Sequence, residues 1–454
     1  MAKINHREQI LNGNLGKAIT TLTIPIVANS FIQTMYNLTD TYWLGKMGEE
    51  NQAAITLVSP VQSIIVNFGS GIVAAGAILI SQYLGAKKDE EAKKMASHIF
   101  VCSLLFSFFC AAICFLLSPS IVSWLGSDHT VKALGTTYLQ IVILDMPFLF
   151  MINVFQAVNQ SQGNTIRPMI LNLVGVTLNM ILDPIFMFGF EWGIAGAAFA
   201  TLLSKVPCAI IALTSLRNRQ NSIFIHLKGF RFDPHMVSSI IKVGIPTAIG
   251  SSTMQFGFLL MGKSVVKYGT VATAAYGIGN RVNSLITLPT NAMGSATATI
   301  VGLNIGAKQY DRAEKTYKLS RNTSVIFLLL GGLILSRDVI SSSFVGIFTS
   351  STEVIQLAAE FLVILALYSW TNGVYNSTAG LFQGSGHTII TMAVDATRLW
   401  VFRFATLFVC EKILDMGIQS IWYSVVISNA ISAFILYFLY RLNIWKKEAI
   451  KLQK

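Results

Sequence analysis

Residues 80–94 read ISQYLGAKKDEEAKK and residues 301–315 read VGLNIGAKQYDRAEK, so that Gly-Ala-Lys recurs at an offset of 221 positions. Other short patterns coincide at the same gapless offset, and they lie up to 138 residues apart along the chain. They are Ile24-Pro25 with Ile245-Pro246, Ala54, Val61 and Ser63 with Ala275, Val282 and Ser284, Val142-Ile143-Leu144 with Val363-Ile364-Leu365, and Gln162-Gly163 with Gln383-Gly384. The offset indicates an internal repeat, with an N-lobe in residues 1–221 and a C-lobe in residues 222–454.

The composition excludes most soluble proteins. Of the 454 residues, 53% are hydrophobic and only 12% are charged, whereas a soluble domain has about 25% charged residues. So few charges could not cover the surface of a soluble protein of this length. The chain is therefore predicted to be a polytopic membrane protein rather than a disordered chain, a disulfide scaffold or a soluble enzyme.

A helix needs about 20 residues to cross the hydrocarbon core, and the sequence has twelve apolar segments of that order. They are residues 18–42, 53–83, 97–119, 134–158, 166–189 and 194–214 in the first half, and 237–262, 274–304, 320–344, 355–381, 389–410 and 418–440 in the second. Six spans per half give both halves the same topology, as in a parallel repeat. We expect an all-α fold of twelve transmembrane helices in two pseudo-symmetric six-helix lobes, with a central cleft between them.

The basic residues predict the orientation in the membrane. If the N-terminus is cytoplasmic, the segments on that side hold 22 of the 33 Lys and Arg residues, while the opposite loops hold six. Such a bias marks the cytoplasmic side. Both termini are therefore predicted to be cytoplasmic in a multi-pass protein of the cell membrane, and the net charge of +12 does not indicate a nucleic-acid partner.

Aspartates within the apolar segments are functional candidates, because a charge inside the bilayer is costly. Counted along their helices, Asp40 lies roughly 33 Å and Asp183 roughly 26 Å from the cytoplasmic end. Asn179 shares a helix face with Asp183, and Thr201 has a similar depth in the next helix. Two carboxylates, an amide and a hydroxyl are thus expected in one layer, where they suit either H⁺ or Na⁺. The alternative is that Asp40 caps a helix end and that Asp183 pairs with backbone before Pro184.

The other buried charges leave their roles open. Asp145 could join this layer or pair with a buried arginine, and Glu360 is expected at a hydrated helix end. Asp395 and Arg398 are three residues apart on one helix, which predicts an internal ion pair. The run 257–264, GFLLMGKS, fits the letters of a phosphate-binding P-loop, but its bulky apolar spacers within a membrane segment argue against such a loop.

Further residues are candidates for substrate contact and for motion. Pro25 interrupts the first helix and could act as a hinge or as a static kink. Polar and aromatic side chains that could line the cleft are Gln33, Tyr36, Asn37, Tyr138, Asn153 and Gln156.

Several motifs resemble those of multidrug and toxic compound extrusion (MATE) transporters. They are IPIVANSFIQTMYNLTDTYWLGKMG in the first helix, ISQYLGAKKDEEAKK after the second, QGNTIRPM after the fourth, LNMILDPIFMFGFEWGIAGAAFAT across the fifth and sixth, and RLWVFR in the eleventh. The resemblance covers essentially the whole chain. It implies cation-coupled export of organic, often cationic, drugs by alternating access.

The resemblance is to the DinF-like branch of that family. It implies a cation site in the N-lobe at Asp40, Asn179, Asp183 and Thr201, a polar network at Tyr138 and Asn153, and substrate contacts at Gln33 and Tyr36. The C-lobe acid of the NorM-like branch has no counterpart, since Gln255 cannot titrate. Asp145 stands where the family is expected to have a small residue.

The sequence therefore predicts an H⁺- or Na⁺-coupled antiporter that exports organic, often cationic, drugs. Its expected partners are amphiphilic substrates and the lipid bilayer, it needs no cofactor besides the coupling ion, and it is expected to function as a monomer. The alternatives are a flippase for a lipid-linked precursor, which would use a strongly cationic central cavity, and a membrane-embedded enzyme, for which the sequence offers no catalytic constellation.

Overall fold

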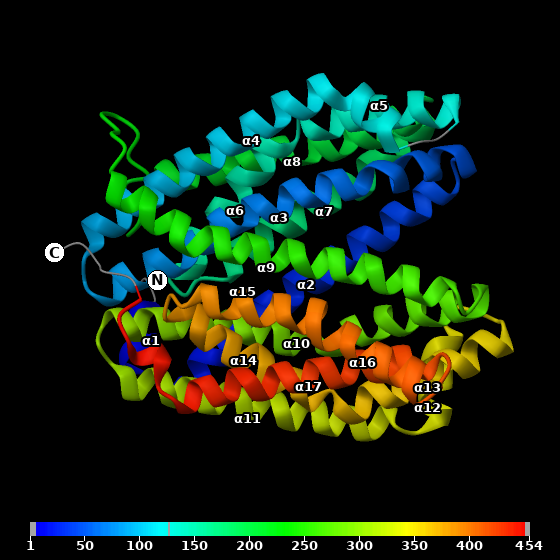
Figure 1. Cartoon of the computed structure of the whole chain (residues 1–454). Helices are drawn as coiled ribbons and strands as arrows, with labels where there is room; N and C mark the ends of the chain where they lie inside the picture. The colour runs from blue at the N-terminus through cyan, green and yellow to red at the C-terminus, as the bar shows by residue number, and fades with distance from the viewer. Residues whose placement is uncertain (1–5, 126–127, 450–454) are drawn as a thin grey trace. The chain divides into compact units, whose positions relative to one another are not determined.

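The computed structural model describes residues 6–125 and 128–449, and these residues form helices joined by short connections, with no β-strand among them. The colours of Figure 1 follow the chain from the first helices in blue to the last in red. The helices of the first half are α1 (His6–Asn12), α2 (Leu15–Gly45), α3 (Glu49–Gly85), α4 (Asp89–Leu125), α5 (His129–Ile143), α6 (Met146–Ser161), α7 (Ile166–Pro184), the π-helix η1 (Ile185–Gly189) and α8 (Gly193–Arg217).

The second half repeats this order with more interruptions. It consists of α9 (Pro234–Val266), α10 (Thr270–Gly306), α11 (Tyr310–Leu335), α12 (Asp338–Gly346), α13 (Thr352–Tyr368), α14 (Trp370–Gly384), α15 (Thr388–Thr397), η2 (Arg398–Arg403), α16 (Phe404–Phe408), η3 (Val409–Ile413), α17 (Gln419–Arg441) and η4 (Ile444–Lys446).

The predicted membrane spans agree with these helices. Among the described residues, seven helices are long and apolar enough to cross a membrane, and two bent pairs, α5 with α6 and α13 with α14, bring the number to nine. Three further helical stretches, α9, α10 and the broken run from Thr388 to Ile413, complete the twelve segments that the sequence predicts.

The structure differs from the prediction at four of the segments, one of which is the broken run from Thr388 to Ile413. The fourth and tenth spans are each broken, with bends of 43° and 54° between their two helices. The predicted segment 320–344 is also two helices, because α11 ends at Leu335 and α12 begins at Asp338. The break between α11 and α12 coincides with the polar residues Ser336, Arg337 and Asp338, which the predicted segment 320–344 had included.

The sequence repeat is also a repeat of backbone geometry. Gly48 and Gly269, 221 positions apart, precede α3 and α10 with φ of 94° and 95°. After the same two helices, Lys87 and Lys308 have φ of 59° and 60°, a left-handed conformation that is uncommon for residues with a side chain. Helix ends that match to the residue confirm the repeat at an offset of 221.

Contacts divide the chain into two compact units. Unit 1 is mainly Pro25–Ala248, and unit 2 contains Glu8–Ile24 and the chain from Ile249 onward. The division thus falls inside α2, at the predicted hinge residue Pro25, and inside α9. The predicted lobe boundary at residues 221–222 lies in the connection between α8 and α9, and the assignment of the lobes to residues 1–221 and 222–454 stays a prediction.

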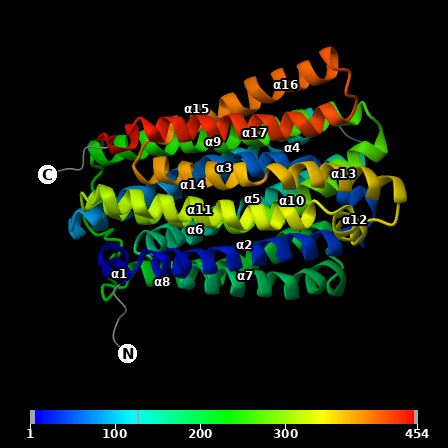
Figure 2. The same cartoon turned by 90° about the horizontal axis from the view of Figure 1, so that it is seen from below.

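Each unit has its own packed interior. In unit 2, α14 packs against both α11 and α17 and lies between them in Figure 2. An aromatic stack of Tyr276, Phe361 and Trp422 joins α10, α13 and α17, and the Phe361 and Trp422 ring centroids are 4.1 Å apart. In unit 1, α7 and α8 form a hairpin beside α5 and α6, and this hairpin carries most of the predicted acid layer.

Candidate functional site

The centre of the predicted acid layer is a hydrogen-bonded group on the α7–α8 hairpin of unit 1. The Asn179 side-chain amide donates to Asp183 Oδ1 at 3.1 Å and to Thr201 Oγ1 at 3.4 Å, and the Thr201 hydroxyl donates to the Ala197 carbonyl at 3.1 Å. All three side chains are buried, with Asp183 only 1% exposed. Asp183 therefore pairs with a side chain rather than with backbone.

Local backbone features bring these residues together. Pro184 ends α7, and the chain continues through the π-helix η1 before it turns into α8. At the turn, Gly193 has a φ of +57°, and Gly196 packs so closely that a Cβ there would lie 2.5 Å from the Phe186 carbonyl oxygen. Because glycine allows this approach, Thr201 lies opposite Asn179.

Asp40 completes the layer from α2. Its side chain is half-buried and lines the main cavity of unit 1, whereas Asp183 lies behind the wall of that cavity. Asp183 is bonded to Asn179, which lines the same cavity as Asp40, and two ionised carboxylates around one cavity repel each other. Their repulsion disfavours the state in which both are ionised with no cation near them.

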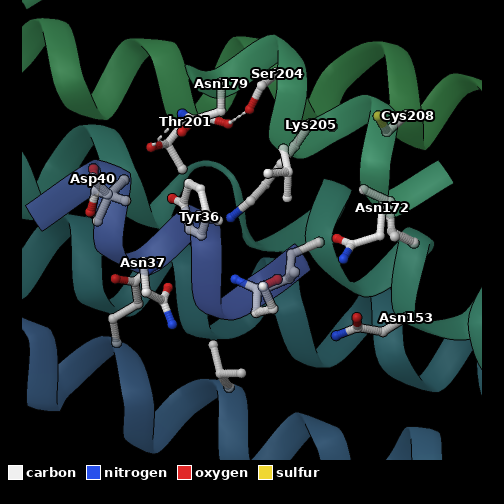
Figure 3. Close-up of a pocket in the computed structure, with 18 of the residues that line it drawn as sticks. Tyr36, Asn37, Asp40, Asn153, Asn172, Asn179, Thr201, Ser204, Lys205 and Cys208 are labelled. Atoms are coloured by element: carbon white, nitrogen blue, oxygen red, sulfur yellow. Dashed lines mark hydrogen bonds between the residues drawn. The ribbon is translucent and has the colours of Figure 1, made fainter. Parts of the chain in front are cut away.

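The cavity has a volume of about 690 Å³ and is lined by α2, α3, α5, α6, α7 and α8. Figure 3 shows Tyr36 on α2 beside Thr201 and Lys205 of α8, whereas Asn37 points to the other side of α2. The residues predicted from sequence that line it are Gln33, Tyr36, Asn37, Asp40, Tyr138, Asn153, Gln156, Asn179 and Thr201. Hence the predicted site residues all line this one cavity, with the exception of Asp183 and the predicted hinge residue Pro25.

Sequence reasoning missed other polar residues of this cavity. Asn172 lies seven residues before Asn179 on α7, and Lys205 lies four residues after Thr201 on α8. Helical periodicity places both on the same faces as the predicted residues, so this spacing could have revealed them. The remaining polar residues of the lining that were not predicted are Asn29, Ser30, Ser59, Gln62, Ser63 and Ser204.

Asp145 pairs with Lys205 rather than with an arginine. It lies at the bend between α5 and α6 and is 0% exposed, while the Lys205 side chain, which donates to its Oδ2, is 23% exposed. Asp145 Oδ1 has no hydrogen-bond donor among the described residues. The charge of this buried aspartate is compensated by a lysine on a neighbouring helix.

The buried charges of unit 2 are enclosed in helix packing. Asp395 and Arg398 form the predicted ion pair at 2.9 Å, and the Arg398 guanidinium lies 4.4 Å from the Tyr375 ring centroid. Arg403 donates to Ser428 and Asn429. Both arginines are at most 5% exposed, so they do not provide the cationic cavity that the flippase alternative requires.

Two other sequence features also have structural explanations. The run 257–264 is part of the continuous helix α9, so its amides are committed to helical hydrogen bonds and cannot surround a phosphate as in a P-loop. Glu360 accepts a hydrogen bond from Gln419 at 2.6 Å. Neither feature contributes to the site.

A cation in this layer would be held by oxygen atoms of different kinds. Within the described part of the chain, no group of three or more His, Cys, Asp or Glu residues is placed to hold a metal ion. The acid layer instead offers two carboxylates, an amide oxygen and a hydroxyl, and the Asn179 Oδ1 and Asp183 Oδ2 atoms have no donor among the residues that the structure describes. Such a set can take up a proton or a weakly bound monovalent cation.

Comparison with known proteins shows similarity over the full length. A family model described as MatE matches residues 25–185 and again residues 246–409, and the two matches begin 221 positions apart. The chain is 23% identical over 442 residues to the probable multidrug resistance protein YoeA of Bacillus subtilis (strain 168), covering 96% of this chain and 95% of YoeA. It is 24% identical over 422 residues to the multidrug export protein MepA of Staphylococcus aureus (strain MSSA476), covering 92% and 91%.

The fold has a close counterpart among solved structures. A MATE protein crystallised in complex with MaL6 aligns with a TM-score of 0.91 over 98% of this chain and 99% of that chain, at 23% sequence identity. A likeness of this extent at low identity shows that the two share the two-lobed, twelve-helix fold.

Proposed function

The chain belongs to the MatE family of multidrug efflux transporters, and on that premise we propose that it is a cation-coupled antiporter that exports organic, often cationic, compounds by alternating access. The coupling cation is H⁺ or Na⁺. The observation that carries the proposal is the buried group of Asn179, Asp183 and Thr201 next to a cavity lined by Asp40. A membrane protein retains acids at this depth when they have a function.

The cavity suits amphiphilic organic substrates. Its volume of about 690 Å³ is within the range of small-molecule pockets. Aliphatic and aromatic side chains alternate in its lining with amides and hydroxyls, among them Gln33, Asn37, Asn153 and Gln156. Sparse hydrogen-bonding groups in an apolar wall accept many ligands, and the Asp40 carboxylate favours those with a positive charge.

The acid layer couples ion uptake to substrate release. When a cation neutralises Asp40 and Asp183, the repulsion between them disappears and the Asn179 amide is free to change partner. Pro25 lies on α2, fifteen residues before Asp40, and lacks the N–H that would bond to the Thr21 carbonyl. We infer that α2 bends near Pro25, which reduces the cavity volume and releases the substrate outward.

The orientation follows from the bias of basic residues. With both termini in the cytoplasm, the loops rich in Lys and Arg lie on the cytoplasmic side of the cell membrane. Asp40 then belongs to the outer half of the bilayer, where it exchanges cations with the outside. Unit 1 supplies the whole site from one chain, which is the basis for a functional monomer.

Transport by purified protein in liposomes tests the proposal. We expect an imposed pH or Na⁺ gradient to drive movement of an organic cation such as ethidium, and Asp40→Asn or Asp183→Asn to reduce this movement at least tenfold. Asp338→Asn is the matched control, since Asp338 is exposed on α12. In the same assay, Pro25→Ala should slow transport, whereas Pro246→Ala should not. Full gradient-driven transport by Asp40→Asn or Asp183→Asn would refute the mechanism.

A further inference from the structure

A lysine borders the cavity that is proposed to bind a cation. Among the residues that line this cavity, the formally charged ones are Asp40 and Lys205. Lys205 is on α8, one turn from Thr201 of the acid layer, and Figure 3 shows its side chain extending into the pocket between α8 and α2. A positive charge in this place is unexpected for a pocket that selects cations, so its role needs an explanation.

Lys205 has carboxylates on two sides. It donates to Asp145 at the α5–α6 bend, and it lines the same cavity as Asp40 and Tyr138. The ammonium is therefore within electrostatic range of the acid layer while it is bonded to Asp145.

The hydrogen-bonding groups leave room for a second arrangement of the ammonium. An ammonium has three N–H donors, and the bond to Asp145 uses one of them. Asp183 Oδ2 and Asn179 Oδ1 are buried acceptors for which residues 6–125 and 128–449 supply no donor. The flexible four-carbon side chain of lysine allows its ammonium group to change position. The short side chain of Asp145 stays close to the backbone of the α5–α6 bend.

We propose that Lys205 is an internal counter-cation, which moves between Asp145 and the Asp40 carboxylate and thereby excludes Na⁺ from the acid layer. This inference rests on the proposed function and deepens it, because it makes H⁺ the coupling ion. A tethered ammonium has a high effective concentration at a nearby carboxylate. A Na⁺ ion needs several oxygen ligands and would have to displace the ammonium from them. A proton binds to a single carboxylate oxygen and needs no such coordination shell.

The test is Na⁺ binding to the full-length protein purified in detergent, measured with ²²Na⁺ at a fixed pH. The informative variant is the double substitution Lys205→Met with Asp145→Asn, because it removes one positive and one negative charge together and leaves Asp40 and Asp183 unchanged. Lys242→Met is the control, since Lys242 is an exposed lysine on α9 that does not line the cavity.

We expect the double variant to bind Na⁺ saturably, and the unmodified protein and the control to show no saturation over Na⁺ concentrations up to on the order of tenfold higher than those that saturate the double variant. Addition of Asp183→Asn to the double variant should abolish the gain. Since the double variant could fold poorly, Asp145→Asn alone provides a second test. It frees Lys205 for Asp40 and should leave Na⁺ binding undetectable.

Saturable Na⁺ binding by the unmodified protein with the same affinity in the double variant would overturn the inference. Na⁺ binding by Asp145→Asn alone would also overturn it. Failure of the proposed function would give a different result. The unmodified protein would then transport no organic cation under an imposed pH gradient or an imposed Na⁺ gradient. If transport occurs but Lys205 has no effect on Na⁺ binding, only the role of Lys205 is wrong.

Discussion

The Asp145–Lys205 ion pair should respond very unequally to removal of its two members. Asp145 is 0% exposed, while the side chain of Lys205 retains 23% of its exposure at the edge of a cavity. Lys205→Met leaves a fully buried carboxylate without a partner, which costs about 3–5 kcal/mol. Asp145→Asn leaves an ammonium that can turn toward water, and we expect a cost of about 1 kcal/mol.

The double variant measures the stability contributed by the Asp145–Lys205 ion pair without the cost of leaving one partner unpaired. Replacement of both members by neutral residues of similar volume is often close to neutral for a buried pair, so its cost should be near that of Asp145→Asn alone. The coupling energy in the double-mutant cycle would then be about 3 kcal/mol, which is large for neighbouring residues.

The assay is unfolding of the purified protein in detergent, followed by tryptophan fluorescence during heating and during denaturant titration. The expected order of stability is unmodified protein, then Asp145→Asn and the double variant together, then Lys205→Met. Equal losses in the two single variants, or additive losses in the double variant, would refute the reasoning from burial.

Two further predictions concern the packing that positions the site. Gly196→Ala should destabilise the protein by about 1–3 kcal/mol, because the added Cβ would meet the Phe186 carbonyl at 2.5 Å, and the thermal midpoint should fall relative to Gly189→Ala, where a Cβ meets nothing within 4 Å. A similar midpoint for both variants would show that the α7–α8 hairpin adjusts freely. His98→Ala should make the loop between α8 and α9 more sensitive to trypsin, since His98 Nε2 accepts the Asp233 N–H at 2.9 Å, and an unchanged cleavage rate would contradict this role.

The sequence alone determined the repeat, the number of spans and the layer of acids. Each of these depends on spacing along the chain. An offset of 221 residues gives equivalent helix ends, and a rise of fixed length per residue predicts the depth of Asp40 and Asp183. The i,i+4 relation of Asn179 and Asp183 holds in any α-helix, so it could be predicted without knowing what surrounds α7.

The tertiary structure decided the partners of the buried charges. Asp145 and Lys205 are 60 residues apart, and only the bend between α5 and α6 brings them together, which no local pattern of hydropathy predicts. The same holds for the cavity, which six helices of unit 1 line. Burial then decides how each carboxylate is compensated, because Asp145 pairs with Lys205 whereas Asp183 accepts a hydrogen bond from the Asn179 amide.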